Sequence, residues 1–202
     1  MRNALFVRFF ALIIALIAWT GIGIHIEAQW RLTGSFLGAA WVLADYFTVT
    51  TNLLVAVVFS IIALLRPGTV GPRLLGFVTI NIALVGVIYM LLLQGLVELT
   101  AGAAVANVLL HMVTPVLVPV FWLFCVPRGQ LTQRDPLIWA LYPITYLVYA
   151  LIRGTAQGHF SYPFINYIEL GITQVAITVV IITLAYLAAG WAMVLLDKRL
   201  AR

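Results

Sequence analysis

The sequence predicts an all-α integral membrane protein, a six-transmembrane-helix bundle with both ends of the chain in the cytoplasm. Of the 202 residues, 64% are hydrophobic and only 8% are charged, whereas about 25% of residues are charged in an average soluble domain. A helix needs about 20 apolar residues to cross the hydrocarbon core of a bilayer. Six runs reach that length, at roughly 5–24, 45–65, 74–93, 105–125, 136–153 and 169–195.

The distribution of basic residues predicts the orientation of these six runs. If the N-terminus is cytoplasmic, the outside segments carry only Arg31 and Arg153. The inside segments then carry Arg2, Arg8, Arg66, Arg73, Arg128, Arg134, Lys198, Arg199 and Arg202. An excess of Lys and Arg on the cytoplasmic side is typical of membrane proteins. Because little sequence remains outside the runs, we expect residues 1–202 to form a single transmembrane domain.

The first two runs are a retained helix and a helix with a polar face. Run 5–24 follows basic residues as a signal peptide does, but the segment after it lacks a small-x-small cleavage pattern, so we interpret it as a retained helix. Segment 25–44 is expected to be an outside connection. Run 45–65 places Thr48, Thr51 and Asn52 on one helical face near its outer end.

The third run, 74–93, follows a turn-rich inside connection, and the fourth run, 105–125, carries His111 well inside apolar sequence. An ionisable group costs a few kcal/mol in a membrane, so it usually faces the protein interior or a wet cavity and marks a functional site. Asn107, His111 and Pro115 follow one another at four-residue spacing and share a face. The lone Cys125 cannot form an internal disulfide.

The fifth run, 136–153, follows a second turn-rich inside connection, and the sixth, 169–195, ends before the basic C-terminal segment. Along the fifth run, Tyr142, Tyr146, Tyr149 and Arg153 form a stripe that climbs towards the outside. The second, fourth and fifth runs therefore each offer a polar or aromatic face. We expect these faces to converge in the outer leaflet.

Thr48 and His111 are the predicted catalytic pair, because both lie a short way below the outer ends of their helices. A hydroxyl nucleophile needs a base within hydrogen-bond reach, and imidazole is the usual one. Candidates to hold the oxyanion or to orient the imidazole are Asn52, Asn107, Tyr142 and Tyr146. Arg153 is a candidate to bind a lipid carboxylate or phosphate, or to act as an interfacial anchor. Taken singly, a membrane threonine more often bonds its own helix, and His111 has an alternative role in helix packing.

Several other kinds of site are not indicated. The basic residues are scattered rather than clustered with aromatics, so nucleic acid is not an expected partner. The chain has no Gly-x-Ser-x-Gly elbow, P-loop, His-Glu-x-x-His pair or dinucleotide-binding glycine pattern, and we expect no cofactor. A metal site is conceivable from residues of the outside segments, but no helical ligand spacing supports it. Those residues are His25, Glu27, His159 and Glu169.

At this point the chain resembles the family of the androgen-induced protein and the androgen-dependent regulator of tissue-factor-pathway inhibitor, which are multispan membrane hydrolases. The resemblance rests on Tyr46-Phe-Thr48, on His111 followed by proline, and on Tyr162-Pro-Phe164, in that order along most of the chain. It implies hydrolysis of fatty acid esters of hydroxy fatty acids, or of a related lipid ester, with Thr48 as nucleophile and His111 as base. The short inside loops and basic tail are those of a bacterial inner-membrane relative.

Two other functions remain open from the residues alone. A transporter of a small lipid or metabolite would also use an intramembrane histidine, but it would need access from both sides of the membrane. A non-catalytic lipid-binding or structural membrane protein would tolerate the loss of Thr48. No duplication of a half-molecule, the usual sign of a transporter built on inverted repeats, is visible in the sequence.

Overall fold

The computed structural model describes residues 3–65, 68–96 and 101–201, and across them it is built of helices with no strand. Six helices in this part of the chain are long and apolar enough to cross a membrane. They span Ala4–Thr33, Phe47–Leu64, Pro72–Leu93, Gly102–Cys125, Asp135–Gln157 and Ile172–Leu200. The predicted class, an all-α integral membrane protein with six spanning helices, is confirmed.

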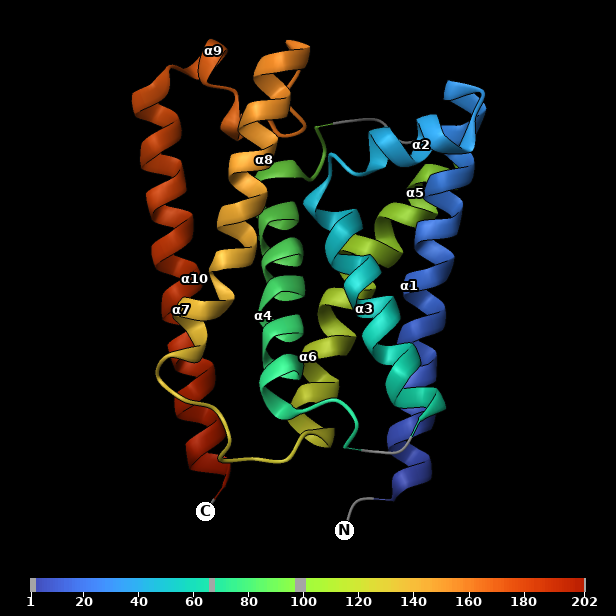
Figure 1. The fold of residues 1–202 in the computed structure, drawn as a ribbon, viewed down its shortest axis with the longest axis vertical. Coiled ribbons are helices and arrows are strands. Elements are labelled where there is room, and N and C mark those ends of the chain that lie inside the picture. The colour runs from blue at the N-terminus through green and yellow to red at the C-terminus, as the bar shows by residue number, and fades with distance from the viewer. Residues whose placement is uncertain (1–2, 66–67, 97–100, 202) are drawn as a thin grey trace. The chain divides into compact units, whose positions relative to one another are not determined.

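The chain divides into two compact units, Met1–Gln130 and Leu131–Arg202 (Figure 1). The first unit contains α1 (Ala4–Thr33), α2 (Phe36–Leu43), α3 (Phe47–Leu64), α4 (Pro72–Ile88), the π-helical segment η1 (Tyr89–Leu93), α5 (Ala101–Val108), a second π-helical segment η2 (Leu109–Val113) and α6 (Thr114–Cys125). The second contains α7 (Asp135–Trp139), α8 (Leu141–Gln157), the short 3-10 helix η3 (Pro163–Ile165), α9 (Tyr167–Leu170) and α10 (Ile172–Leu200). The single domain expected for residues 1–202 stays a prediction.

In the first unit, α1 packs along α3 and α4 packs along α6 (Figure 1). A cluster of aromatic rings joins three of these helices. The ring of Phe121 in α6 lies 4.9 Å from that of Phe59 in α3 and 5.5 Å from that of Phe10 in α1. Near the same end, Arg8 Nε donates to the carbonyl of Ala63 at 2.9 Å. These contacts hold α1, α3 and α6 together at the end remote from α2.

The segment between the first two spans differs from the expected connection at 25–44. Helix α1 continues to Thr33, where Gly34 ends it with a left-handed φ of 71° and an N–H bond to the carbonyl of Trp30. Glycine is the residue best suited to that conformation. Ser35 then caps the short helix α2 by accepting from the N–H of Gly38 at 2.9 Å. The prediction placed the end of the first helix too early because the apolar run ends near residue 24, while the helix continues through a more polar segment to Thr33.

In the second unit, the fifth span is divided between α7 and α8. Pro143 has no N–H to donate to the preceding turn, and this weakens the helix at that point. Asp197 of α10 is buried, and its Oδ2 accepts from the N–H of Leu131 at 2.9 Å. A Cβ at Gly190 would lie 2.8 Å from Cβ of Pro136, so α10 and α7 approach each other closely there. The basic positions Arg2, Arg66 and Arg202 lie outside the described residues.

Candidate functional site

Thr48 and His111, 63 residues apart in the chain, lie in contact within the first unit. Thr48 is in the first turn of α3 and His111 is in η2. Thr48 Oγ1 and His111 Nε2 are 3.1 Å apart, which is hydrogen-bond distance. Thr48 is buried, and His111 is partly buried. The adjacency predicted from their matched depth is confirmed, while their catalytic role stays a prediction.

The second nitrogen of His111 determines what the first can do. His111 Nδ1 lies 3.2 Å from the backbone carbonyl oxygen of Asn107. A carbonyl oxygen only accepts hydrogen bonds, so we assign the proton of the neutral ring to Nδ1. Nε2 then carries the lone pair and accepts from the hydroxyl of Thr48. This is the tautomer that a general base for Thr48 requires.

The π-helical turn around His111 and the proline after it leave backbone groups to be satisfied by side chains. The N–H of Thr114 bonds the carbonyl of Leu109, five residues earlier, and Pro115 has no N–H to continue the pattern. The carbonyl of Leu110 instead accepts from Asn52 Nδ2 at 3.1 Å. It also lies 3.2 Å from Thr114 Oγ1, whose one hydrogen it shares with Asn52 Oδ1 at 2.7 Å. Such π-helical turns are frequent at functional sites.

Asn52 joins the helix of Thr48 to the helix of His111. It is fully buried, and its amide nitrogen donates to the carbonyls of Thr48, at 2.9 Å, and Leu110, at 3.1 Å. Its Oδ1 accepts from Thr114 Oγ1 at 2.7 Å. Both amide hydrogens are therefore in use. Of the two roles foreseen for Asn52, this geometry favours positioning of the pair over binding of an oxyanion.

Asn107 and Tyr89 support the ring of His111 on its other side. Besides the carbonyl that bonds Nδ1, Asn107 provides a side-chain amide that donates to the hydroxyl of Tyr89 at 2.6 Å. The rings of Tyr89 and His111 have centroids 4.4 Å apart and planes inclined by 32°. Tyr89 belongs to η1, so both π-helical segments contribute to the site. The orienting role foreseen for Asn107 agrees with these contacts.

Two glycines allow neighbouring helices to approach the His111 segment. A Cβ at Gly21 of α1 would lie 2.6 Å from Cδ2 of Leu110, and a Cβ at Gly86 of α4 would lie 2.6 Å from Cβ of Pro115. Real Cβ atoms do not come so close to other heavy atoms. The approach at Gly86 is one that only glycine permits, because the proline ring cannot rotate away, whereas the contact at Gly21 is with the flexible side chain of Leu110.

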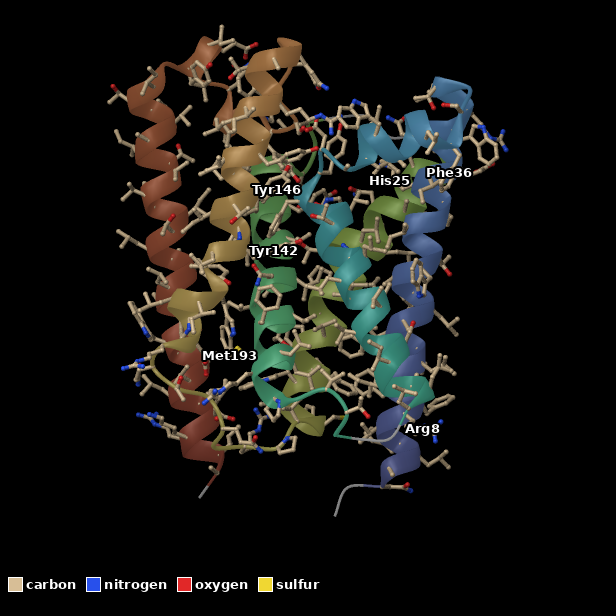
Figure 2. The ribbon with its side chains drawn as sticks, viewed as in Figure 1. Arg8, His25, Phe36, Tyr142, Tyr146 and Met193 are labelled. Carbon is tan, nitrogen blue, oxygen red and sulfur yellow. The ribbon has the colours of Figure 1, made fainter. Side chains whose placement is uncertain are left out.

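The remaining candidates, Tyr142, Tyr146 and Arg153, lie on α8 in the second unit (Figure 2). Arg153 is buried and donates from Nη1 to the hydroxyl of Tyr149 at 2.6 Å. The ring of Tyr146 lies 6.1 Å from that of Tyr149 and 6.4 Å from that of Tyr162. Three members of the stripe foreseen on this helix, Tyr146, Tyr149 and Arg153, therefore form a local cluster with Tyr162. Its participation at Thr48 and His111 stays a prediction.

Sequence reasoning missed Thr114, Tyr89 and the two glycines. The Thr114-Pro115 dipeptide is a usable signal, because a proline in a membrane helix leaves a carbonyl that a neighbouring hydroxyl can bond. Tyr89 gave no comparable signal, since a tyrosine near the end of a span is usually an interface anchor. Among the described residues of either unit, no three His, Cys, Asp or Glu side chains gather where they could hold a metal ion.

Comparison with known proteins found no match among family models, curated proteins or solved structures. A buried hydroxyl bonded to a neutral imidazole, whose other nitrogen is fixed by a carbonyl, can attack an electrophilic carbon and transfer its proton to the ring. This is the constellation used in acyl transfer.

The bridge between Thr114 and Asn52 predicts a difference between two buried threonines. Thr79 Oγ1 donates to the carbonyl four residues earlier in its own helix at 2.7 Å. The one hydrogen of Thr114 Oγ1 instead has its closer acceptor in another helix, Asn52 Oδ1 at 2.7 Å, with the carbonyl of Leu110 at 3.2 Å. We expect Thr114→Val to lose about 1 kcal/mol more stability than Thr79→Val, the usual size of an interhelical hydrogen bond in a membrane protein. Unfolding of the purified protein by denaturant measures both. Equal losses would show that the bridge contributes nothing.

Proposed function

We propose that this protein is an intramembrane hydrolase of lipid esters, with Thr48 as nucleophile and His111 as general base. The contact of 3.1 Å between Thr48 Oγ1 and His111 Nε2 carries the proposal. The bond of His111 Nδ1 to the carbonyl of Asn107 supports it, because it leaves Nε2 free to accept a proton. No cofactor is required by this chemistry.

In the proposed reaction, Thr48 Oγ bonds to the carbonyl carbon of the ester while His111 Nε2 takes the hydroxyl proton. The carbonyl electron pair moves to oxygen and then returns as the bond to the alcohol oxygen breaks. His111 returns the proton to the departing alkoxide. A water molecule then attacks the acyl-threonine by the same route, with His111 as base, and releases the fatty acid and regenerated Thr48.

The start of α3 favours the developing negative charge. Thr48 lies in the first turn of the helix, where backbone N–H groups have no acceptor within the helix itself. The positive end of the helix dipole lies at the same place. The N–H of Thr48 is therefore available to the carbonyl oxygen of a bound ester, as the N–H of the nucleophile is in serine hydrolases.

For the substrate, we propose a lipid ester that enters from the bilayer, and first of all a fatty acid ester of a hydroxy fatty acid. The pair lies on two of the six apolar helices, and this supports a substrate delivered from lipid. The chemical class of the ester follows from the resemblance to the androgen-induced protein family through Tyr46-Phe-Thr48, His111 and Tyr162-Pro-Phe164. We propose membership of that family on the same residues.

A hydrolysis assay tests this function. The purified protein in detergent is incubated with a fatty acid ester of a hydroxy fatty acid and, separately, with a triacylglycerol and a phospholipid. We expect release of fatty acid and hydroxy fatty acid, measured by mass spectrometry, in proportion to enzyme. Absence of release from every ester, with protein that remains folded, would contradict the proposal and favour the transport or lipid-binding alternatives.

We also propose that the protein spans the inner membrane of a bacterium with both termini in the cytoplasm, since nine of its eleven basic residues then lie inside. Single cysteines at the exposed positions Thr69 and Gln157, in a background where the buried Cys125 is replaced by Ala, report this topology. We expect an impermeant maleimide to label Gln157→Cys in intact cells and Thr69→Cys only after lysis. The reverse pattern would contradict the topology.

A further inference from the structure

His25 of α1 has a buried nitrogen that its surroundings leave unsatisfied. Its Nδ1 is shielded from solvent and has no hydrogen-bond partner among the described residues. Buried polar groups in proteins are nearly all bonded, and an exception needs an explanation. A group that bonds a substrate when one is present is one such explanation. Figure 2 shows His25 far along α1 from Arg8, towards the end where α2 lies.

The packing of α1 brings His25 close to His111. Gly21, one helical turn before His25, is the point at which α1 contacts Leu110, the residue before His111. The two helices run in opposite directions (Figure 1). Side chains on a helix lean towards its N-terminus, so the side chains of His25 and His111 lean towards each other.

His25 also borders the helix of the proposed nucleophile. Its ring lies 6.4 Å from the ring of Tyr46, with planes inclined by 40°. Tyr46 is the residue before α3 and lies two positions from Thr48. The second imidazole therefore lies near both members of the proposed pair, on an element that contributes neither of them.

The proposed reaction needs a second group to stabilise negative charge on the carbonyl oxygen. Oxyanion sites commonly combine two donors, and loss of one lowers kcat by about 10²–10³-fold. The N–H of Thr48 provides one. Asn52 cannot readily provide the other, because both of its amide hydrogens bond carbonyls. A neutral imidazole in a water-poor site is an effective donor of this kind.

We propose that His25 is a further catalytic residue, whose Nδ1–H donates to the carbonyl oxygen of the bound lipid ester. This inference rests on the proposed hydrolase function. As Thr48 Oγ bonds to carbon and the electron pair moves to oxygen, the hydrogen bond from His25 shortens and strengthens. His25 keeps its proton throughout, while His111 alone takes and returns the proton of Thr48. The substrate class is an ester with an accessible carbonyl.

Two amide substitutions separate this role from a structural one. The amide nitrogen of Asn can occupy the position of Nδ1, whereas that of Gln reaches towards the position of Nε2. We expect His25→Gln to lower kcat by about 10²–10³-fold with little change in KM, and His25→Asn to retain most of the activity. His159→Gln is the matched control, since His159 is exposed in the second unit, and it should match the unsubstituted protein.

The outcomes distinguish the two proposals. Suppose that the unsubstituted enzyme is active, that Thr48→Ala is inactive, and that kcat of His25→Gln stays within roughly threefold of the original. That loss is far smaller than the loss expected from removing one oxyanion donor. This result would overturn the role of His25 and leave the hydrolase function standing. Equal losses in His25→Asn and His25→Gln would also overturn it, because a purely structural residue gives that result. If the unsubstituted enzyme shows no hydrolysis that depends on Thr48, the proposed hydrolase function is contradicted. The role of His25 is then contradicted as well, because it rests on that function.

Discussion

Replacement of Thr48 or His111 by Ala is expected to abolish hydrolysis of lipid esters while leaving the protein folded. Thr48→Ala removes the nucleophile, and His111→Ala removes the base, whose contribution alone is about 10²–10⁴-fold. The two groups act as one unit, so the double variant should be hardly slower than either single variant. Initial rates of fatty acid release, with the unfolding temperature of each variant, provide the measurement.

Thr50→Ala is the matched control for this experiment. Thr50 lies two residues from Thr48 in the same helix, and its hydroxyl donates to the carbonyl of Phe47 at 3.1 Å. Loss of that bond within its own helix should leave the rate unchanged. Full activity of Thr48→Ala would contradict the hydrolase mechanism and favour a binding or transport function. Loss of activity in Thr50→Ala to the same extent would indicate a general disturbance of α3.

The second large effect is expected from Gly86→Ala. The added Cβ would lie 2.6 Å from Cβ of Pro115 and 3.5 Å from the carbonyl oxygen of His111. The proline ring cannot rotate away, so α4 and α6 must separate. Overpacking of this kind costs about 1–3 kcal/mol, against a gain of about 1 kcal/mol from replacing a helical glycine by alanine. We expect a net loss of stability.

The same substitution should also slow the reaction. A shift of the helix that carries His111 by about 1 Å is enough to lower a rate by about 10²-fold. Gly23→Ala is the control, because a Cβ at Gly23 meets nothing within 4 Å, and it should keep activity and gain slightly in stability. Unfolding curves and initial rates of both variants decide the matter. If Gly86→Ala has the same stability and the same initial rate as the original protein, the close approach at Pro115 has no functional importance.

The spanning helices were predictable because their signal is local. Each is a predominantly apolar run of the length that a bilayer demands. The largest difference in boundaries is at α1, which continues beyond its apolar run to Thr33. Helix α1 passes through Gly21 and Gly23 and ends only at Gly34. A glycine inside a helix is tolerated when a neighbouring helix packs against it, as Leu110 does at Gly21. That partner is invisible in the sequence of α1.

The pair at the centre of the site was also predictable, from depth and residue type. Thr48 and His111 each lie a short way below the predicted outer end of their helix, and a hydroxyl and an imidazole are a chemically matched pair. The partners that orient them were only partly foreseen. Asn52 and Asn107 lie on the faces predicted from helical spacing. The bond of Asn52 to Thr114 and the tilted ring contact of Tyr89 with His111 depend instead on which helices pack together. Spacing along one helix carries no information on that pairing.

The most direct test of the account is covalent labelling by a fluorophosphonate probe in native membranes, followed by identification of the modified residue by mass spectrometry. We expect Thr48 Oγ to bond to phosphorus with loss of fluoride, and His111 to take the hydroxyl proton. Thr48 should then be the modified residue, and His111→Ala should prevent its modification. Labelling at another residue of the chain, or labelling that persists in Thr48→Ala at the original rate, would contradict the assignment of Thr48 as nucleophile.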